Sequence, residues 1–418
     1  MKRTTALAAM RRAIPTIVIC LFVTFLFERA GILDFFNNFA IDLFTIVHPA
    51  PEPRDVFIVA IDEQDYHRTF GATSPLDRPQ LQKILDAVVA GHPQAIGIDI
   101  QTDDPRFRKL HVPDGAPPIV WVARPIVHNE PCWWWFACSR YEPGTFLGGN
   151  DPDGDCARSC AAIPFILPAR GDAVIRRYLL KVPSTHDREI ESFSAKTVAA
   201  CAYGTRSATL AAHCRAARQR FPGQAAEQII NFTGTPWSAH TLRAADVVAL
   251  ARATQNGGEW ADGSLDGKIV LIGGTYPEAR DSYATPLGER AGVEVVADAI
   301  ESELGGGVSD VQEWIGYLVD VTIGLAIAAC VPFLSFRRAL LLGFIAIPLL
   351  GAIVSYLVFQ RFGYWFNVVP IAFGVYLHEL ADHAREYVRL RDAVERAGMR
   401  ELLDPDEEEI ARVSAERA

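Results

Sequence analysis

The sequence lacks the short motifs that mark many hydrolases and nucleotide-binding enzymes. It has no G-x-S-x-G, no H-E-x-x-H and no G-x-x-x-x-G-K-[ST] pattern. Gly263–Lys268 is one residue short of the last pattern, and its lysine leads into a predicted strand rather than a helix. We therefore expect a protein that is not an enzyme and that uses no cofactor and no metal ion.

The sequence also lacks an excess of positive charge and a signal-peptide cleavage site. It has 40 Lys and Arg against 50 Asp and Glu, so its net charge is −10, which argues against a nucleic-acid partner. The apolar stretch Ile14–Phe27 is followed by Glu28 and Arg29 rather than by an A-x-A-like site. We predict that residues 1–36 hold a cytoplasmic N-terminus and an uncleaved membrane anchor.

Long hydrophobic runs are present near both ends of the chain. Half of the residues are hydrophobic, and the mean hydropathy is +0.12. A helix needs about 20 apolar residues to cross roughly 30 Å of hydrocarbon. Trp314–Leu334 and Ala339–Phe359 meet that length, and a shorter run, Tyr364–Leu377, follows. The sequence therefore predicts an α-helical membrane part, with one N-terminal span and three spans in residues 314–378, around an extracytoplasmic domain in residues 37–313.

Basic residues near the predicted spans set the expected orientation. They precede the first span, lie between the second and third, and follow the fourth, whereas the third-to-fourth connection carries only Arg361. This pattern predicts a multi-pass protein of the bacterial inner (plasma) membrane, with both termini in the cytoplasm and the large domain in the periplasm. The basic residues are Lys2, Arg3, Arg11, Arg12, Arg337, Arg338, Arg385, Arg389 and Arg391.

The cysteines agree with an oxidising compartment for that domain. Cys20 and Cys330 lie in predicted spans, and the other six lie in the predicted outer domain. An even number on one side of the membrane predicts disulfide bonds, and pairing of sequence neighbours is the simplest of the 15 arrangements. A metal site and free buried thiols are the alternatives. The six are Cys132, Cys138, Cys156, Cys160, Cys201 and Cys214.

Short apolar runs in the outer domain predict an α/β fold. Residues 55–62 and 95–100 are apolar runs typical of strands buried on both faces, and residues 77–91 between them have helical spacing. Strand, helix and strand over about 45 residues form a parallel βαβ unit. Further buried strands are predicted at 119–123 and at 265–275, so we expect a largely parallel sheet.

Residues 128–172 differ from the rest of the domain. They are rich in Pro, Gly, Asp and Cys, which predicts an irregular, disulfide-held insertion. The insertion contains Trp133, Trp134, Trp135 and Phe136 in succession. This aromatic run is a candidate docking patch for a protein partner, and the core of a small disulfide loop is the alternative.

Polar residues and glycines follow three of the predicted strands. In doubly wound sheets, ligands bind outside the carboxyl ends of parallel strands. If the three strands are neighbours, these ends form one polar crevice for a small ligand or a cation. The alternative is that the carboxylates cap helices or pair with Arg78, and that the glycines serve tight turning and packing. The candidate ligand-binding residues are Asp62, Glu63, Arg78, Asp99, Gly273, Gly274, Thr275 and Asp281.

Asp320 lies within the second predicted span. Charged groups inside a membrane are costly and often functional. Because Asp320 is only about six residues from Trp314, hydration from the outer face is the alternative.

Several stretches resemble the second class of CHASE domain, the cyclase- and histidine-kinase-associated sensory extracellular domain. The resemblance begins with Val56–Glu63 and the Gly97-Ile-Asp99 stretch, and its longest part is Leu265–Thr275 with Asp281–Gly288. It covers about residues 35–310, and the family also has one span before the domain and three after it. Two features depart from the family: Gly71–Arg78 replaces a Trp- and Pro-rich stretch, and the cysteine-rich insertion is not general.

The resemblance implies an extracytoplasmic sensor whose output module follows the last span. Residues 379–418 are too short for a kinase or cyclase, and we expect a cytoplasmic helix and an acidic tail there. The predicted function is therefore a membrane-anchored sensor that signals to a separate effector protein, with homo-oligomer formation open. The alternatives are a structural subunit of a bacterial envelope complex and an extracytoplasmic metal-dependent hydrolase using Asp62 and Asp99.

Overall fold

The computed structural model describes the central domain and short parts of the rest of the chain. No helix among the described residues is both long and apolar enough to cross a bilayer. The chain divides into two units, of which the larger comprises Phe35–Gln312 and Val358–Phe366. The described residues are 22–27, 30–310 without 134–135, 145–155, 165, 169–171, 185–188, 221–226, 256–263 and 307, then 347–362, 364–365 and scattered residues near both ends.

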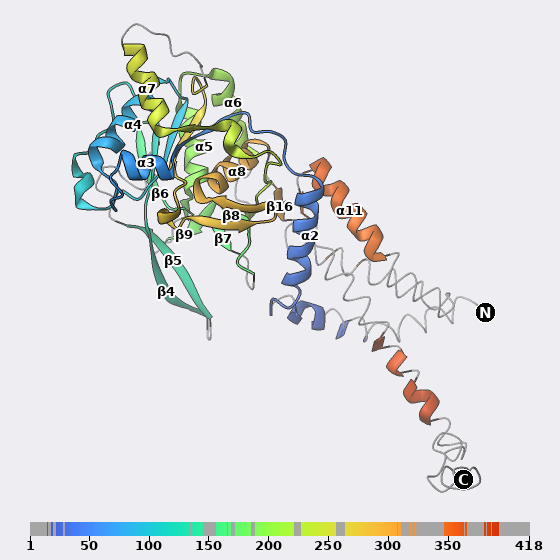
Figure 1. Cartoon of the computed structure of the whole chain (residues 1–418). Helices are drawn as coiled ribbons and strands as arrows, with labels where there is room; N and C mark the ends of the chain where they lie inside the picture. Colours follow the sequence, from blue (N-terminus) through green and yellow to red (C-terminus); the bar gives the residue numbers. More distant parts are fainter. Residues whose placement is uncertain are drawn as a thin grey trace, which may run out of the picture. The chain divides into compact units, whose positions relative to one another are not determined.

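A six-stranded parallel sheet forms the centre of the larger unit (Figure 1). Every neighbouring pair in this sheet runs parallel, so the predicted α/β class with a largely parallel sheet is confirmed. The strands, in spatial order, are β12 (Thr241–Arg243), β1 (Val56–Ile61), β13 (Ile269–Gly274), β2 (Ala95–Asp99), β3 (Ile119–Val122) and β6 (Ser159–Ala162).

Helices cover both faces of this sheet, as the runs of apolar residues in its strands require. In β1, Ile58 packs into the cluster that contains residues of α5, α6 and α8, whereas Val59 and Ile61 pack into the cluster of α3, α4 and α7. The helices are α3 (Glu63–Arg68), α4 (Arg78–Ala90), α5 (Phe193–Tyr203), α6 (Ala208–Arg220), α7 (Ala244–Gln255) and α8 (Gly292–Leu304).

A second sheet lies beside α2 (Asp34–Val47) in the same unit. Its order is β17-β16-β11-β8-β7, and β17 (Tyr364–Trp365) pairs in parallel with β16 (Val308–Asp310). Ile41 of α2, Ile229 of β11 and Trp365 of β17 form one buried cluster. The first two residues of the fourth predicted span thus join the sheet of the outer domain. The other strands are β7 (Ile166–Pro168), β8 (Ile175–Leu179) and β11 (Glu227–Ile229).

The stretch 128–172 is more regular than predicted. β4 (Pro125–Trp133) and β5 (Phe136–Pro143) form an antiparallel hairpin that projects from the body in Figure 1, and β6 is an edge strand of the main sheet. The expectation of an irregular insertion is therefore wrong over these residues. The prolines and glycines of this stretch are residue types typical of turns, and for that reason its composition predicts loops rather than strands.

Two small antiparallel strand pairs complete the fold. β9 (Lys181–Pro183) pairs with β10 (Glu189–Glu191), and β14 (Ser282–Thr285) pairs with β15 (Gly288–Ala291). Three short 3₁₀ turns are also described: η1 (Pro105–Lys109), η2 (Trp237–His240) and η3 (Pro277–Ala279). α11 (Ile347–Phe362) lies within the third predicted span and extends slightly beyond it.

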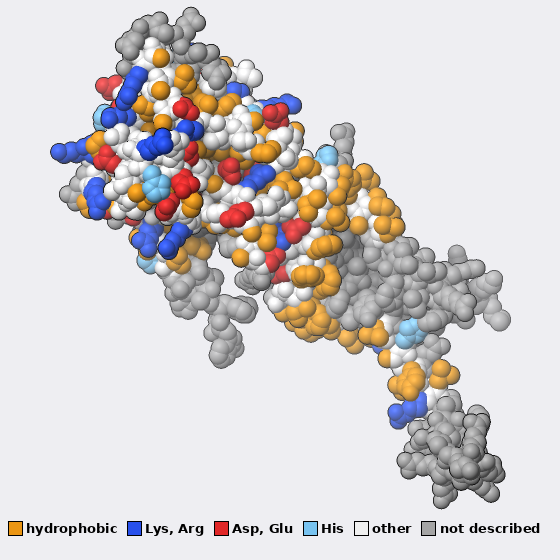
Figure 2. Space-filling model, in the orientation of Figure 1, with side chains coloured by type: hydrophobic (Ala, Val, Ile, Leu, Met, Phe, Trp, Pro, Cys, Tyr) orange, Lys and Arg blue, Asp and Glu red, His pale blue; other side chains and the backbone are white. Residues whose placement is uncertain are grey.

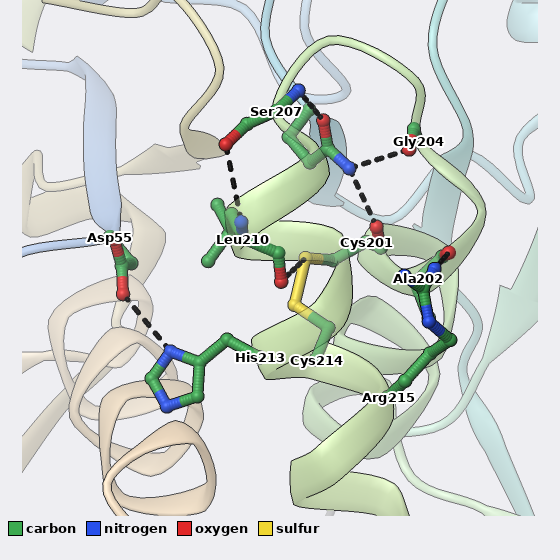
Figure 3. The surroundings of a disulfide bond; sticks show 10 residues. Asp55, Cys201, Ala202, Gly204, Ser207, Leu210, His213, Cys214 and Arg215 are labelled. Atoms are coloured by element: carbon green, nitrogen blue, oxygen red, sulfur yellow. Dashed lines mark hydrogen bonds and ion pairs between the residues drawn. A yellow bond between two sulfur atoms is a disulfide. The ribbon is translucent and has the colours of Figure 1, made fainter.

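Two of the three predicted cysteine pairs are disulfides in the structure. Cys156 bonds to Cys160, and Cys201 of α5 bonds to Cys214 of α6. Figure 3 shows the second disulfide between the two helices. The third predicted pair, Cys132 with Cys138, has side chains outside the described residues.

The loop between α5 and α6 is held from the sheet side by Gln94. Its amide nitrogen donates to the carbonyl oxygens of Cys201 and Gly204, at 2.9 and 2.7 Å. Its side-chain oxygen accepts from the backbone nitrogen of Ser207 at 2.7 Å. The Cys201–Cys214 disulfide therefore closes a helical hairpin that is already fixed to the start of β2 (Figure 3).

Candidate functional site

The carboxyl ends of β13 and β2 open into a cavity of about 510 Å³. Because β1, β13 and β2 are neighbours in the sheet, the predicted condition for a shared crevice is met. Asp99, Gly274 and Asp281 line the cavity, so it brings together three of the eight predicted ligand-binding residues. Other lining residues come from α3, from β14, from α8 and from the loops between elements: Tyr66, Asp103, Asp104, Tyr276, Glu278, Arg280, Tyr283, Gly292 and Val296.

Asp99 and Asp281 are the two carboxylates of the cavity whose pKa values are raised. Asp103, Asp104, Glu278 and Arg280 also contribute to its charge. Burial and, to a lesser extent, the nearby charge of Asp281 together raise the pKa of Asp99 to about 7. Burial also raises the pKa of Asp281, although a hydrogen bond from Tyr283 lowers it. A positive ligand between the two carboxylates would relieve both effects, because an opposite charge favours the ionised form.

An aromatic pair forms another part of the cavity wall. The rings of Tyr66 and Tyr276 stack with centroids 4.3 Å apart and an interplanar angle of 5°. Tyr66 comes from α3 and Tyr276 from the loop after β13, so the stack holds together the loops that follow two neighbouring strands. The Tyr276 ring packs against Gly274. A Cβ at that position would be only 2.8 Å from the ring, so a larger residue would displace it.

Asp62 is one of the predicted residues that do not line the cavity. Its carboxylate caps α3 by accepting from the backbone nitrogen of Asp65 at 2.7 Å, and it pairs with Arg243 at 2.7 Å. This is the capping alternative that the sequence left open, with Arg243 rather than Arg78 as the basic partner. Arg78 instead donates to the carbonyl oxygen of Lys109 at 3.1 Å.

Three more predicted residues also lie outside the cavity lining. Glu63 is exposed at the start of α3. Thr275 donates its backbone nitrogen to the carbonyl oxygen of Ile61 at 3.0 Å. Gly273 allows α8 to approach the sheet, because a Cβ at that position would be 2.6 Å from Val293. Gly273 therefore has the packing role that the sequence analysis gave as the alternative to ligand binding.

Sequence reasoning missed the loop residues of the cavity. Tyr276 and Glu278 follow β13 directly, and Asp103 and Asp104 follow β2 within five residues, so their order after a strand was a usable signal. Tyr66 gave no such signal, because its side chain reaches the cavity from within a helix. A loop places its side chains by tertiary contacts that no local pattern records.

α8 connects the cavity to the second sheet. Gly292 and Val296 of its first half line the cavity. In its last turn, Glu301 accepts hydrogen bonds from the backbone nitrogens of Arg54, Asp55 and Val56 at 2.9–3.0 Å. The chain then enters β16, four residues after the helix ends.

A buried polar set fixes the middle of α8. The carboxylate of Asp298 accepts from the backbone nitrogen of Thr233 at 3.1 Å and pairs with Arg290. Burial raises the pKa of Asp298 to about 6 against the opposing effect of Arg290. Ser302 accepts from the backbone nitrogen of Asn231 at 2.8 Å. These bonds join α8 to the 231–233 segment.

The family model of the CHASE2 domain matches residues 17–335, which is more than half of the chain. This chain belongs to the CHASE2 domain family. The family consists of sensory extracellular domains, so the resemblance inferred from Val56–Glu63 and Leu265–Thr275 is confirmed. No curated protein and no solved structure matches the chain.

Some predicted sites fall where the CHASE2 structure is not described. Asp320, Trp134 and Trp135 lie outside the described residues, as do the side chains of Trp133 and Phe136. Among the described residues, no group of three or more His, Cys, Asp and Glu side chains is arranged to hold a metal ion.

Proposed function

We propose that this protein is a membrane-anchored extracytoplasmic sensor that binds a small, positively charged ligand in the Asp99 cavity. The observation that carries the proposal is the pair of carboxylates, Asp99 and Asp281, at the carboxyl ends of the CHASE2 sheet. Their shared burial is a cost that a cationic ligand offsets. The stacked tyrosines beside them suit an organic ammonium group as well as an inorganic cation.

The proposed anchoring rests on the hydrophobic runs at both ends of the chain. Residues 314–378 and 14–27 have the apolar length or context of membrane spans. Within α11, Leu349, Leu350 and Ile353 are exposed in the described structure, as a lipid-facing helix surface requires. The proposed location is the bacterial inner membrane, with the CHASE2 domain in the periplasm.

The proposed signal path runs through α8. Ligand binding at Asp99 and Asp281 acts on the start of α8 through Gly292, because a Cβ there would lie 2.1 Å from the Asp281 carboxylate. The far end of α8 leads into β16, which pairs with β17 at the start of the fourth predicted span. A shift of α8 therefore moves β16 and, through the strand pairing, β17, and both strands adjoin proposed spans. Ligand binding would in this way change the relative populations of two arrangements of the membrane helices.

The proposed receiver of the signal is a separate cytoplasmic protein. Residues 379–418 contain a charged stretch with heptad-like spacing and an acidic run. A predicted helix of that kind can dock against a partner, and it can also pair with a second copy of the chain.

Thermal unfolding of the full chain in mild detergent tests the ligand site. We expect Mg²⁺, Ca²⁺ or spermidine to raise the Tm, since a ligand at 100 times its Kd stabilises the folded state by about 2.7 kcal/mol. Asp99→Asn should abolish the shift. Glu63→Gln is the matched control, because this carboxylate follows the neighbouring strand but lies outside the cavity. An equal shift in wild type and Asp99→Asn would place binding elsewhere.

The β4–β5 hairpin favours a second candidate function, that of a structural subunit of an envelope complex. The hairpin extends beyond the domain in Figure 1, and its base is fixed to Ser184 by a hydrogen bond from Arg140 at 3.1 Å. Purification from the native membrane in mild detergent, with mass spectrometry of bound proteins, separates the two functions. A cytoplasmic enzyme in the eluate supports a sensor, and envelope proteins at constant ratio support a scaffold.

A further inference from the structure

An apolar stripe runs along one face of α2. Six large apolar side chains of this 14-residue helix are between 45% and 72% exposed. Their spacing follows the period of an α-helix, so they share one side. Figure 2 shows hydrophobic side chains gathered along this helix. The stripe consists of Phe35, Phe36, Phe39, Leu43, Ile46 and Val47.

The face of α2 opposite the stripe and one edge of the stripe are both fixed to the domain, so the stripe cannot turn inward. Asp42 forms a bidentate ion pair with buried Arg176 of β8, at 2.6 and 2.7 Å. The side chain of Asn37 accepts a hydrogen bond from the indole nitrogen of Trp365 at 3.0 Å. Ile41 is 2% exposed in the cluster with Trp365. These contacts hold the stripe outward in the folded unit.

The charges around the stripe suit hydrocarbon. No Lys or Arg occurs between Ala30 and Pro53. Of the two acids in α2, Asp34 stands at the helix start. Asp42 borders the stripe next to Phe39 and Ile46, and its charge is neutralised by Arg176. An apolar surface forms no hydrogen bonds or ion pairs with a polar protein partner or an anionic headgroup. Removing it from water stabilises the bound state by about 25 cal/mol per Å² of apolar area.

A second copy of the chain is a poorer occupant than lipid. Specific protein interfaces use about 20–30 residues a side, and the stripe supplies six. The stripe begins at Phe35, eight residues after the apolar N-terminal segment 14–27, which is the proposed membrane anchor.

We propose that the apolar stripe of α2 lies in the interfacial region of the lipid bilayer and holds the base of the CHASE2 domain against it. An amphipathic helix in this position buries its apolar face about 5–10 Å below the headgroups. The inference rests on the proposed membrane attachment, and it adds a lipid contact made by the outer domain itself. α2 thereby fixes the height of β8 and β17 relative to the bilayer.

Photo-crosslinking in the full chain tests this contact. Phe39 and, separately, Ile46 are replaced by p-benzoylphenylalanine, and the protein is reconstituted into vesicles of phosphatidylethanolamine and phosphatidylglycerol. Tyr203 of α5, an exposed aromatic residue outside the stripe, is the matched control site. We expect lipid adducts at positions 39 and 46 in at least ten-fold excess over position 203, measured by mass spectrometry.

The outcomes separate this inference from membrane attachment. A crosslinked dimer without lipid adducts at positions 39 and 46 would overturn the inference in favour of a second copy. Absence of any adduct at either position in vesicle-bound protein would also overturn it and leave the attachment standing. Recovery of the full chain free of the vesicles would overturn both proposals together.

Discussion

Asp99 shows how one residue links the candidate site to stability. An acid whose folded-state pKa is raised binds its proton more tightly in the folded state, so stability falls as pH rises through the interval between the two pKa values. For Asp99 that interval runs from about 4 to about 7, and the whole cost is present above pH 7.

Asp99→Asn should therefore raise the Tm of the full chain at pH 8 and leave it nearly unchanged at pH 4. The gain is a few kcal/mol at most, since one pKa unit corresponds to about 1.4 kcal/mol. Thermal unfolding at the two pH values measures it. Asp62→Asn is the control, and it should lower the Tm at pH 8, because Asp62 caps α3 and pairs with Arg243. Equal effects of both substitutions would contradict the assignment.

Glu303 makes a second prediction at the scale of one residue. Its carboxylate is buried in α8, and burial raises its pKa to about 8, with the charge of Glu191 acting in the same direction. In the described part of the chain, Oε2 of Glu303 and the hydroxyl of Tyr178 are buried without a hydrogen-bond partner.

Glu303→Gln should increase the free energy of unfolding at pH 9 and change it little at pH 5, because the neutral amide avoids the buried charge. Urea denaturation at both pH values provides the measurement. Ser302→Ala in the same turn is the control and should destabilise at both pH values, since it removes the bonds to Asn231 and Asp298. A loss of stability in Glu303→Gln at pH 9 would show that the charged form has a partner.

At the scale of elements, the two described disulfides should differ in what they contribute. Cys201–Cys214 closes 13 residues and joins α5 to α6, whereas Cys156–Cys160 closes four. In the chain-entropy account, the longer loop gives about 3 kcal/mol and the shorter about 2. All four cysteines are buried, so the difference in loop length decides the comparison.

Replacing Cys201 and Cys214 by Ala should therefore lower the free energy of unfolding more than replacing Cys156 and Cys160. Denaturation of both double variants under oxidising conditions measures the difference. A larger loss in the Cys156 and Cys160 variant would mean that the edge of the sheet at β6, rather than the helical hairpin, limits stability.

The ion pair between α2 and β8 is a second test at this scale. Arg176 is 3% exposed and binds Asp42 and Asp172. Arg176→Leu leaves two carboxylates without their partner, and we expect a loss of about 3–5 kcal/mol, as for other broken buried pairs. Arg206→Leu, at an exposed ion pair with Asp266, is the control and should have a small effect. Comparable losses in both variants would contradict the buried role of Arg176.

At the scale of the whole molecule, the parallel pairing of β16 and β17 brings together residues from both sides of two predicted spans. Ser309 lies opposite Tyr364 in this pairing. Both strands must be on the same side of the membrane, which two intervening spans allow. The proposed topology and the pairing of β16 with β17 therefore both place these two strands on the same side of the membrane.

Ser309→Cys combined with Tyr364→Cys should form a disulfide in the full chain under oxidising conditions, since paired strands bring Cα atoms within disulfide reach. Mass spectrometry of the non-reduced peptides detects it. Ser309→Cys with Arg361→Cys is the control and should crosslink at least ten-fold less. A crosslink absent from the first variant, or equal in both, would contradict the pairing and weaken the proposed signal path.

The amino-acid sequence by itself determined the family, the strands at the centre of the parallel sheet and two described cysteine pairs. Residues 55–62, 95–100 and 265–275 are runs of apolar residues long enough to need burial on both faces. This pattern can be recognised within each short stretch, without knowledge of its partners in the fold. Cys201 and Cys214 are close in the chain, so their pairing needed little tertiary information.

Only the tertiary structure decided which predicted residues share a cavity. Asp62 and Asp99 both follow buried strands, yet Asp62 caps α3 beside Arg243, whereas Asp99 faces Asp281. The exposed stripe of α2 and the joining of Trp365 to the second sheet also depend on partners far away in the chain. Contacts of that kind follow from how finished elements pack against one another, and the sequence pattern of one element carries no record of its distant neighbours.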